Sequence, residues 1–297
     1  MSECYMKKVL IVGANGFVGR NLAEYFTEKY ELYTPSSQEL NVLDGNAVEH
    51  YIKTHAFDVV LNALDRRMVN VPNGDMVYVA ERLRMFQNLT RLSDYFGKML
   101  YFGTGAEYGR TMPIKLITEE QFGRIIPEDP YGFLMYTMQM LALTKKNITN
   151  FRLFGIFGPY ELYKSRFISN AICKALCGYP ITIRQNAIFD YLYIDDLGKM
   201  TEHFIENSMK HTSYNATSGK YYELTELACM VQNIVNKNIP ILIAKPGFKS
   251  EYTSSNALIL REFRDTINPI EGHIEKLVDY YKKRINEIDK ESLLYNS

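Results

Sequence analysis

Three glycines spaced three residues apart separate an apolar run from a helical pattern near the start of the chain. Gly13, Gly16 and Gly19 follow residues 9–12, a continuous β-branched and Leu run typical of a strand buried on both faces. Apolar residues then recur with helical spacing over residues 17–29. Glycine at such a strand-to-helix turn permits the tight turn and close approach of a phosphate to the backbone. The helix start favours anions, so the sequence predicts a dinucleotide-binding loop.

Strand and helix patterns alternate through the first half of the chain. Strands are predicted at residues 32–33, 58–62, 99–102 and 151–153, and helices at 47–54, 76–96 and 131–146. Such alternation is typical of a parallel sheet covered by helices on both faces.

The pattern changes after residue 159, where we expect a helix near 167–177 and an amphipathic helix at 274–288. We therefore predict an α/β protein with a Rossmann-type doubly wound parallel sheet and a smaller C-terminal α/β substrate lobe. The expected dinucleotide-binding domain is 1–159, with 182–206 returning to it, and the expected substrate lobe is 160–181 with 207–297.

Bulk composition limits the classes of function. The 297 residues include 34 Lys plus Arg and 34 Asp plus Glu, so no global field attracts nucleic acid. The four apolar residues before the glycine loop are too few for a signal peptide, which needs about 7–15. No apolar run approaches the ~20 residues of a membrane span. We expect a cytoplasmic protein that binds neither nucleic acid nor membrane.

The cysteines and acidic pairs do not form a metal-binding pattern. Four cysteines are too few for a disulfide framework in a chain of this length. Cys173 and Cys177 share one helical face and read as small buried hydrophobes, with no histidine at zinc-like spacing. Asp195 and Asp196 are better explained as the start of a helix that follows a strand. We expect no metal site.

Segments along nearly the whole chain resemble one known family, the extended short-chain dehydrogenases/reductases (the NAD-dependent epimerase/dehydratase family). Within it, the chain is similar to nucleotide-sugar 4-reductases of the GDP-fucose synthase and deoxysugar reductase type. The matching segments are the G-x-x-G-x-x-G loop and residues 39–44, 62–63, 103–109, 130–132, 152–159 and 191–197. Their order and spacing carry the resemblance.

The resemblance implies a set of site residues. Thr104 and Tyr131 take the catalytic roles, with Thr104 positioning the sugar oxygen and Tyr131 exchanging the proton. The alternative for Thr104 is a hydroxyl that only caps a nearby turn. The implied cofactor contacts are Gly13, Asn15, Gly16, Phe17, Val18, Arg20, Ser36, Asn41, Val42, Asn62, Ala63, Phe102, Tyr131, Phe154 and Ile156. The implied substrate contacts are Thr104, Glu107, Arg166 and Arg184.

The nicotinamide cofactor is predicted from the second strand. An acidic residue after that strand normally binds the adenosine ribose hydroxyls. Residues 34–37 instead read Thr-Pro-Ser-Ser. The Ser36 hydroxyl and the Arg20 guanidinium suit a 2′-phosphate, so we predict NADP(H), with NAD(H) as the alternative.

Two positions depart from the family pattern. The family lysine, four residues after the tyrosine, is replaced by Met135, which can neither lower the tyrosine pKa nor hydrogen-bond a ribose. A neutral tyrosine is the default at neutral pH. Met135 therefore favours ketone reduction over alcohol oxidation. The second departure is Phe189, where family members commonly carry an arginine that reaches the diphosphate; Arg166 or Arg184 is the expected substitute.

Three hypotheses follow. The first is an NADP(H)-dependent reductase of the 4-keto group of a nucleotide-linked deoxysugar. The second is a nucleotide-sugar epimerase or dehydratase with tightly bound NAD. The third is a degenerate member that binds dinucleotide as a regulatory or scaffold subunit. In each case the resemblance implies a nucleotide-diphosphate sugar as ligand and a homodimer formed through the helices near 76–96 and 131–146.

Overall fold

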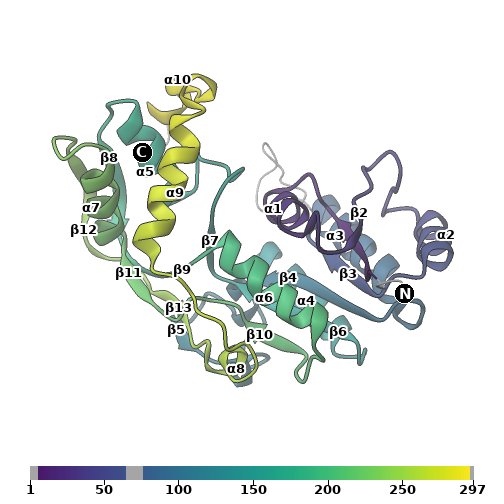
Figure 1. Cartoon of the computed structure of the whole chain (residues 1–297). Coiled ribbons are helices and arrows are strands. Elements are labelled where there is room, and N and C mark those ends of the chain that lie inside the picture. Colours follow the sequence, from purple (N-terminus) through teal and green to yellow (C-terminus); the bar gives the residue numbers. More distant parts are fainter. Residues whose placement is uncertain (1–5, 65–75, 295–297) are drawn as a thin grey trace. The chain divides into compact units, whose positions relative to one another are not determined.

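The structure is a computed structural model that describes residues 6–64 and 76–294. The chain divides into two compact units (Figure 1). The first unit comprises Met1–Met112, Thr118–Leu153 and Gly198–Ala216, and the second comprises Pro113–Ile117, Phe154–Leu197 and Thr217–Ser297.

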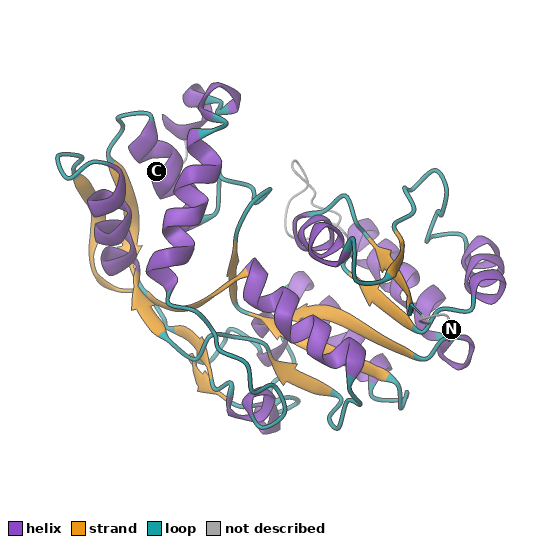
Figure 2. Ribbon diagram, viewed as in Figure 1, coloured by secondary structure: helices purple, strands orange, loops and turns teal. Residues whose placement is uncertain are grey.

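The first unit is built on a parallel sheet in the order β10-β6-β4-β3-β1-β2. Its strands are β1 (Lys8–Val12), β2 (Glu31–Tyr33), β3 (Val59–Asn62), β4 (Lys98–Thr104), β6 (Ile148–Leu153) and β10 (Ser213–Asn215). Its helices are α1 (Phe17–Phe26), α2 (Gly45–His55), α3 (Met76–Thr90), α4 (Pro130–Ala142) and the greater part of α6 (Ile194–Glu206). The predicted α/β class with a parallel sheet is confirmed (Figure 2).

Alternating side chains of the strands enter a core on one face of this sheet. Leu10, Val60, Met99 and Tyr101 point into a cluster with buried residues of α2, α3 and α4. The opposite face receives α6, whose Phe204 ring lies 5.2 Å from that of Phe151 on β6. The sheet is therefore covered on both faces, which explains why its strands are apolar without alternation.

The second unit carries smaller sheets and a separate group of helices. One sheet has the order β11-β9-β13-β5, with β7 beside β9, and the other pairs β12 with β8. The strands are β5 (Ile114–Ile117), β7 (Gly155–Phe157), β8 (Ile181–Asn186), β9 (Ile188–Tyr193), β11 (Tyr221–Glu223), β12 (Ile241–Phe248) and β13 (Tyr252–Ser254). The helices are α5 (Phe167–Leu176), α7 (Leu224–Val235), α8 (Ala257–Leu260), α9 (Ile270–Lys282) and α10 (Lys290–Leu294).

The division of the chain differs from the expected one in four segments: residues 113–117, 154–159 and 182–197 belong to the second unit, and residues 207–216 belong to the first. Residues 182–193 were expected in the Rossmann domain, but β8 and β9 pair with strands of the second unit. Residues 207–216 were expected in the substrate lobe, but β10 pairs in parallel with β6 and extends the large sheet. Pairing between strands that are far apart in the sequence determines where β8, β9 and β10 belong. Local periodicity does not reveal such pairing.

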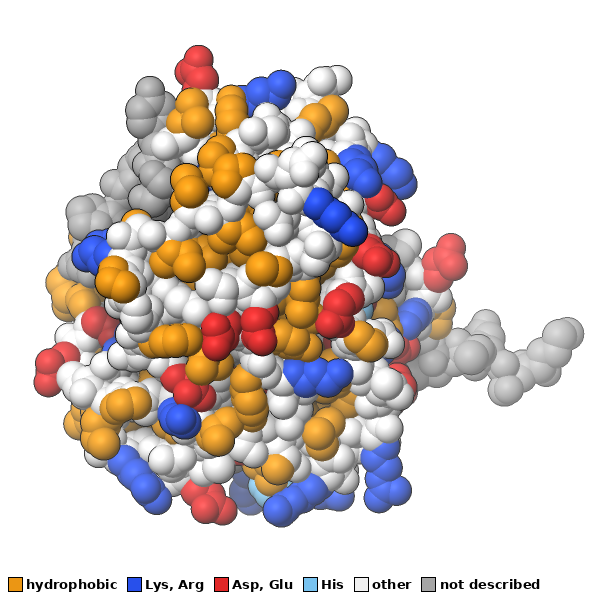
Figure 3. Space-filling view, turned by 90° about the vertical axis from the view of Figure 1, so that its left-hand side faces the viewer, with side chains coloured by type: hydrophobic (Ala, Val, Ile, Leu, Met, Phe, Trp, Pro, Cys, Tyr) orange, Lys and Arg blue, Asp and Glu red, His pale blue; other side chains and the backbone are white. Residues whose placement is uncertain are grey.

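Side chains of several kinds mix on the side of the molecule that carries α7, β8 and β12. Figure 3 shows hydrophobic side chains across this face, interspersed with acidic and basic ones. Strand β12 contributes Leu242, Ile243 and Phe248, each about half exposed. Helices α5 and α7 of the same unit pack on β8.

The glycine loop yields a stability prediction. A Cβ on Gly19 would lie 2.3 Å from the carbonyl oxygen of Gly13, so Gly19→Ala forces the backbone apart. We expect a loss of about 1–3 kcal/mol in the free energy of unfolding. Gly272→Ala is the matched control: this helical glycine has nothing within 4 Å of its Cβ position, and alanine there should stabilise by about 0.4–1 kcal/mol. Urea unfolding of both full-length variants is the measurement, and equal shifts would contradict the packing role of Gly19.

Candidate functional site

The first candidate site is the turn between β1 and α1, where each glycine has a separate structural role. Gly13 has φ +86°, a conformation that favours glycine, and a Cβ there would lie 2.7 Å from the carbonyl oxygen of Ala63. Gly19 packs its helix against Gly13. Gly16 begins the helix, with its N–H donating to the Gly13 carbonyl at 2.9 Å. The turn thus has the tight bend and close packing predicted from the spacing.

The start of α1 suits an anionic ligand. Gly16 is the N-cap residue and, having no side chain, makes no side-chain cap hydrogen bond itself. The next residues are half-buried or buried, whereas Asn15 is exposed at the tip of the loop. The backbone N–H groups and the positive end of the helix dipole at this helix start favour an anion. The residues present fit a dinucleotide pyrophosphate, with Phe17 and Val18 supplying N–H donors.

The segment after β2 is organised by Glu39. Its carboxylate accepts a hydrogen bond from the Ser36 backbone N–H at 2.7 Å, which lowers the pKa of Glu39 from its usual range. Asn41 accepts from the Leu43 N–H at 3.1 Å, and Val42 is buried. The carboxylate that residues 34–37 lack is therefore supplied near Ser36 by a residue three positions further on. The sequence did not predict this proximity, because it results from a turn between Ser36 and Glu39.

The end of β3 lies against the glycine loop. Asn62 is buried and its side chain accepts from the Leu64 N–H at 3.2 Å, which turns the chain as it leaves the strand. The Ala63 carbonyl and the Leu64 nitrogen are the atoms nearest to the Cβ position of Gly13. The structure thus brings the predicted contacts Asn62 and Ala63 beside the loop.

Thr104 ends β4 and begins a short 3-10 helix, η2 (Gly105–Tyr108). Its hydroxyl accepts from the Ala106 N–H at 3.3 Å, and its own N–H donates to Glu107 at 3.1 Å. Thr104 therefore caps a turn, which is the alternative given above to a role in positioning the sugar oxygen. A hydroxyl that accepts in this way can still donate its proton, so the cap and a substrate role are compatible. Phe102, two residues earlier on the same strand, is half-buried.

Tyr131 is the second residue of α4. Asp129 caps this helix by accepting from the Gly132 N–H at 2.9 Å. Gly132 has no room for a side chain, since a Cβ would lie 3.0 Å from the Ala106 carbonyl oxygen. The glycine of the Pro-Tyr-Gly segment therefore lets α4 approach η2 closely. The segments that carry Thr104 and Tyr131 are packed together as a result.

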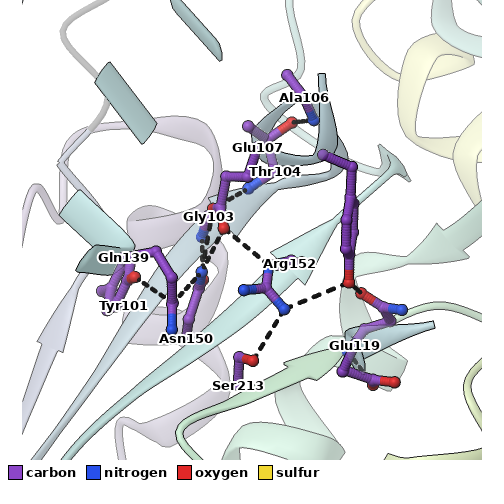
Figure 4. A network of polar contacts seen from close by, with 12 residues as sticks. Tyr101, Gly103, Thr104, Ala106, Glu107, Glu119, Gln139, Asn150, Arg152 and Ser213 are labelled. Carbon is purple, nitrogen blue, oxygen red and sulfur yellow. Dashed lines mark hydrogen bonds and ion pairs between the residues drawn. The ribbon is translucent and has the colours of Figure 1, made fainter. Parts of the chain in front are cut away.

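A buried polar network adjoins the Thr104 turn (Figure 4). Arg152 and Glu107 are both fully buried and form an ion pair of 2.7 Å between Nε and Oε2. Asn150 donates to Glu107 and, at 2.9 Å, to Gln139 of α4, which also accepts from the Tyr101 hydroxyl at 2.7 Å. These side chains come from β4, η2, α4 and β6. The network therefore connects the strand of Thr104 to the helix of Tyr131.

The network corrects the expectation for Glu107 as a substrate contact. The side chain is fully buried, and its carboxylate is bound by Arg152, Asn150 and the Thr104 backbone. Burial raises the pKa of Glu107 above its usual range, although Arg152 opposes this. A group so enclosed holds its neighbours in place and does not meet a ligand. Gly103 makes this possible, because a Cβ there would lie 2.2 Å from Glu107 Oε1.

Met135 lies in the apolar core. Its side chain is 2% exposed and belongs to the cluster formed by α2, α3, α4 and the strands, together with Leu134 and Met138. Tyr131 packs against the same cluster while remaining half-buried. The position of the family lysine is thus filled by apolar packing, as the sequence indicated.

The remaining predicted residues belong to the second unit. Phe154 and Ile156 lie at β7, where the Phe154 ring is 4.8 Å from that of Tyr252. Arg166 is the exposed N-cap residue of α5, and Arg184 is exposed on β8. These two arginines come from different elements of the unit, and their roles remain predictions.

Phe189 and one further departure from the family pattern, Gly155, have physical explanations. Gly155 stands where the family has Asn, and a Cβ there would lie 2.5 Å from the Asp190 carbonyl oxygen. Phe189 packs its ring 5.8 Å from Tyr191 and 5.9 Å from Tyr252. Asp190 itself is buried and accepts from the Ser218 and Gly219 backbone N–H groups, and burial raises its pKa to about 6.

Residues 6–64 and 76–294 contain neither a metal-binding cluster nor a membrane-spanning helix. No group of three or more His, Cys, Asp or Glu in this part of the chain is placed to hold a metal ion. No helix in the same ranges is long and apolar enough to cross a membrane. Cys173 is buried, Cys177 half-buried and Cys229 exposed, all as free thiols, while Cys4 lies outside the described residues.

Comparison with known proteins shows the family of the chain. The sequence profile of the NAD dependent epimerase/dehydratase family matches residues 9–217. GDP-L-colitose synthase from Yersinia pseudotuberculosis is 22% identical over 253 residues, which is 77% of this chain and 82% of that protein.

Solved structures share the fold. A GDP-L-fucose synthetase from Naegleria fowleri bound to NADP has a TM-score of 0.80 at 16% identity, covering 96% of this chain and 97% of that one. GDP-mannoheptose C4 reductase from Campylobacter jejuni with NADP bound has a TM-score of 0.78 at 18% identity, covering 93% and 98%.

The buried ion pair yields a second prediction. Arg152→Met leaves the Glu107 carboxylate buried without its cation, and we expect a loss of about 3–5 kcal/mol in the free energy of unfolding. The double variant Glu107→Gln/Arg152→Met removes both charges and should recover part of that loss. Lys164→Met, which breaks the exposed pair with Asp289, is the control and should change stability little. Urea unfolding of all variants tests this, and simple additivity in the double variant would refute direct coupling.

Proposed function

Because the chain belongs to the NAD dependent epimerase/dehydratase family, we propose that it is a nicotinamide-dependent reductase of the 4-keto group of a nucleotide-linked deoxysugar. The single observation that carries this proposal is the close packing of the Thr104 turn against the first turn of α4, which carries Tyr131. This arrangement stands at the carboxyl edge of the sheet, where open α/β sheets bind their ligands.

The residues divide the chemistry between them. The Thr104 hydroxyl donates to the keto oxygen and holds it near Tyr131. The Tyr131 hydroxyl then gives its proton to that oxygen as negative charge develops. A bound nicotinamide supplies the hydride. The glycine loop binds the pyrophosphate through Gly16, Phe17 and Val18 and keeps water from the anion.

Met135 determines the direction that we propose. An apolar side chain within a packed core does not stabilise a tyrosinate, so Met135 favours the protonated form of Tyr131. A protonated tyrosine is the proton donor that ketone reduction needs, whereas alcohol oxidation needs the deprotonated form. The named activities of similar proteins, a GDP-L-colitose synthase and a GDP-mannoheptose C4 reductase, support a reductase.

NADP(H) is the proposed cofactor, bound by Arg20 and Ser36 at the adenosine end. Arg20 is exposed just after the glycine loop and forms an ion pair of 3.4 Å with Glu24. Glu39 near Ser36 is the feature that favours NAD(H), since its carboxylate repels a 2′-phosphate. The NADP-bound structures among the similar folds support the first choice.

We propose a nucleotide-diphosphate sugar as the ligand, with Arg166 and Arg184 as candidates for its diphosphate. A homodimer through α3 and α4 is also proposed. Phe133 and Met140 lie seven residues apart on one face of α4, and each is nearly half exposed. Large apolar side chains in such a row are typical of a covered helix face. A cytoplasmic location remains the expectation from the sequence.

The activity prediction uses a panel of 4-keto-6-deoxy nucleotide sugars with NADPH. We expect absorbance loss of the reduced nicotinamide with at least one sugar, and a kcat lower by about 100-fold or more for Tyr131→Phe. Tyr136→Phe on the same helix is the matched control and should keep full activity. If the whole panel were inactive with the natural chain but active with Met135→Lys, the proposed function would be rejected.

The cofactor prediction concerns Arg20→Met. Loss of one charge-assisted hydrogen bond should weaken NADP(H) binding about tenfold, while NAD(H) binding stays unchanged. Calorimetric titration of both cofactors measures the difference. Equal weakening of the two cofactors would show that Arg20 does not contact the 2′-phosphate.

A further inference from the structure

Arg82 is a buried cation with few partners. It lies within α3 and is 6% exposed. Its Nη1 donates to the backbone carbonyl of Leu64, and its Nε has no hydrogen-bond partner among the described residues. A guanidinium carries five N–H donors and stays charged. A buried charge without a counterion carries a large desolvation penalty, so its presence calls for a ligand or a role.

The anchor point of Arg82 lies between the two halves of the proposed dinucleotide site. Leu64 follows the end of β3, and β3 lies between β1 and β4 in the sheet. Strand β1 ends in the glycine loop, and β4 ends at Thr104. The Leu64 nitrogen is also 2.8 Å from the Cβ position of Gly13. A dinucleotide that runs from the loop to Thr104 therefore passes the end of β3.

Arg82 also neighbours the helix that lacks the family lysine. Helices α3 and α4 pack together. Leu83 of α3, Met135 and Tyr131 of α4, and Leu64 share one apolar cluster. Arg82 is the seventh residue of α3 and Met135 the sixth of α4, so both lie about two turns into their helices.

We propose that Arg82 supplies the positive charge that Met135 does not, and that its guanidinium donates to the nicotinamide ribose of the bound dinucleotide. This rests on the dinucleotide-dependent function proposed above. The unpartnered Nε provides a donor, and a ribose hydroxyl provides an acceptor. Because arginine keeps its proton throughout the working pH range, Arg82 acts on dinucleotide binding, and Tyr131 remains the proton donor.

The test compares binding of two probes by calorimetry. NADPH contains the nicotinamide ribose, whereas ADP contains only the adenosine and diphosphate half. Arg82→Met should weaken NADPH binding about tenfold or more and leave ADP binding unchanged. Arg82→Lys should keep most of the NADPH affinity. In the double variant Arg82→Met/Met135→Lys, the ammonium on α4 should restore NADPH binding at least in part.

Two controls separate this role from a structural one. Arg84→Met removes an exposed arginine from the same helix and should leave both affinities unchanged. Thermal unfolding without ligand should show Arg82→Met to be at least as stable as the natural chain, because an unpaired buried charge is removed. A lower melting temperature with unchanged NADPH affinity would make Arg82 a structural residue and overturn the inference.

The remaining outcomes also decide between proposals. Equal weakening of NADPH and ADP by Arg82→Met would place the guanidinium at the diphosphate and overturn the ribose assignment. Failure of the natural chain to bind either NADPH or NADH would overturn the proposed function itself. If the natural chain binds NADPH and Arg82→Met binds it equally well, only the role of Arg82 fails.

Discussion

The ion pair between Glu107 and Arg152 fixes the geometry on which the candidate site depends. Both side chains are fully buried, so they cannot exchange partners with water. Arg152 also donates to Ser213 of β10 at 2.8 Å, and its guanidinium lies 4.7 Å from the centre of the Phe122 ring. A pair of buried charges is costly unless its surroundings are complementary. The elements that supply those surroundings are therefore held in one arrangement.

This constraint reaches the reactive residues through the backbone. Glu107 accepts from the Thr104 N–H, and Asn150 accepts from the Gly103 N–H at 3.0 Å. Through Gln139 the same network reaches α4, eight residues beyond Tyr131. Apolar packing alone tolerates sliding of a helix over a sheet, whereas directed hydrogen bonds do not. The positions of Thr104 and Tyr131 thus follow from this polar core.

The sequence predicts well what short-range physics decides. The glycine loop and the Pro-Tyr-Gly segment work because a Cβ would strike nearby backbone, and residues close in the chain carry that information. The burial of Glu107 was not predictable, because its partner Arg152 lies 45 residues away and a charged residue reads as exposed. The pairing of β10 with β6 was also not predictable, because the two strands are far apart in the sequence. The sequence pattern likewise predicts that Arg82 lies on the exposed polar face of a helix, whereas the structure shows it as a buried residue of α3.

The two departures from the family pattern affect different steps. Phe189 joins an aromatic group with Tyr191 and Tyr252 and removes a cation from β9, which concerns only how a substrate is held. Met135 places an apolar side chain where the family has a lysine, near Tyr131, the proposed proton donor, which concerns the proposed reaction itself. A charge supplied from α3 by Arg82 would preserve the binding contribution of that cation without recreating a lysine one turn from Tyr131. Such a division favours binding of the reduced dinucleotide and a protonated tyrosine together, and those are the two requirements of ketone reduction.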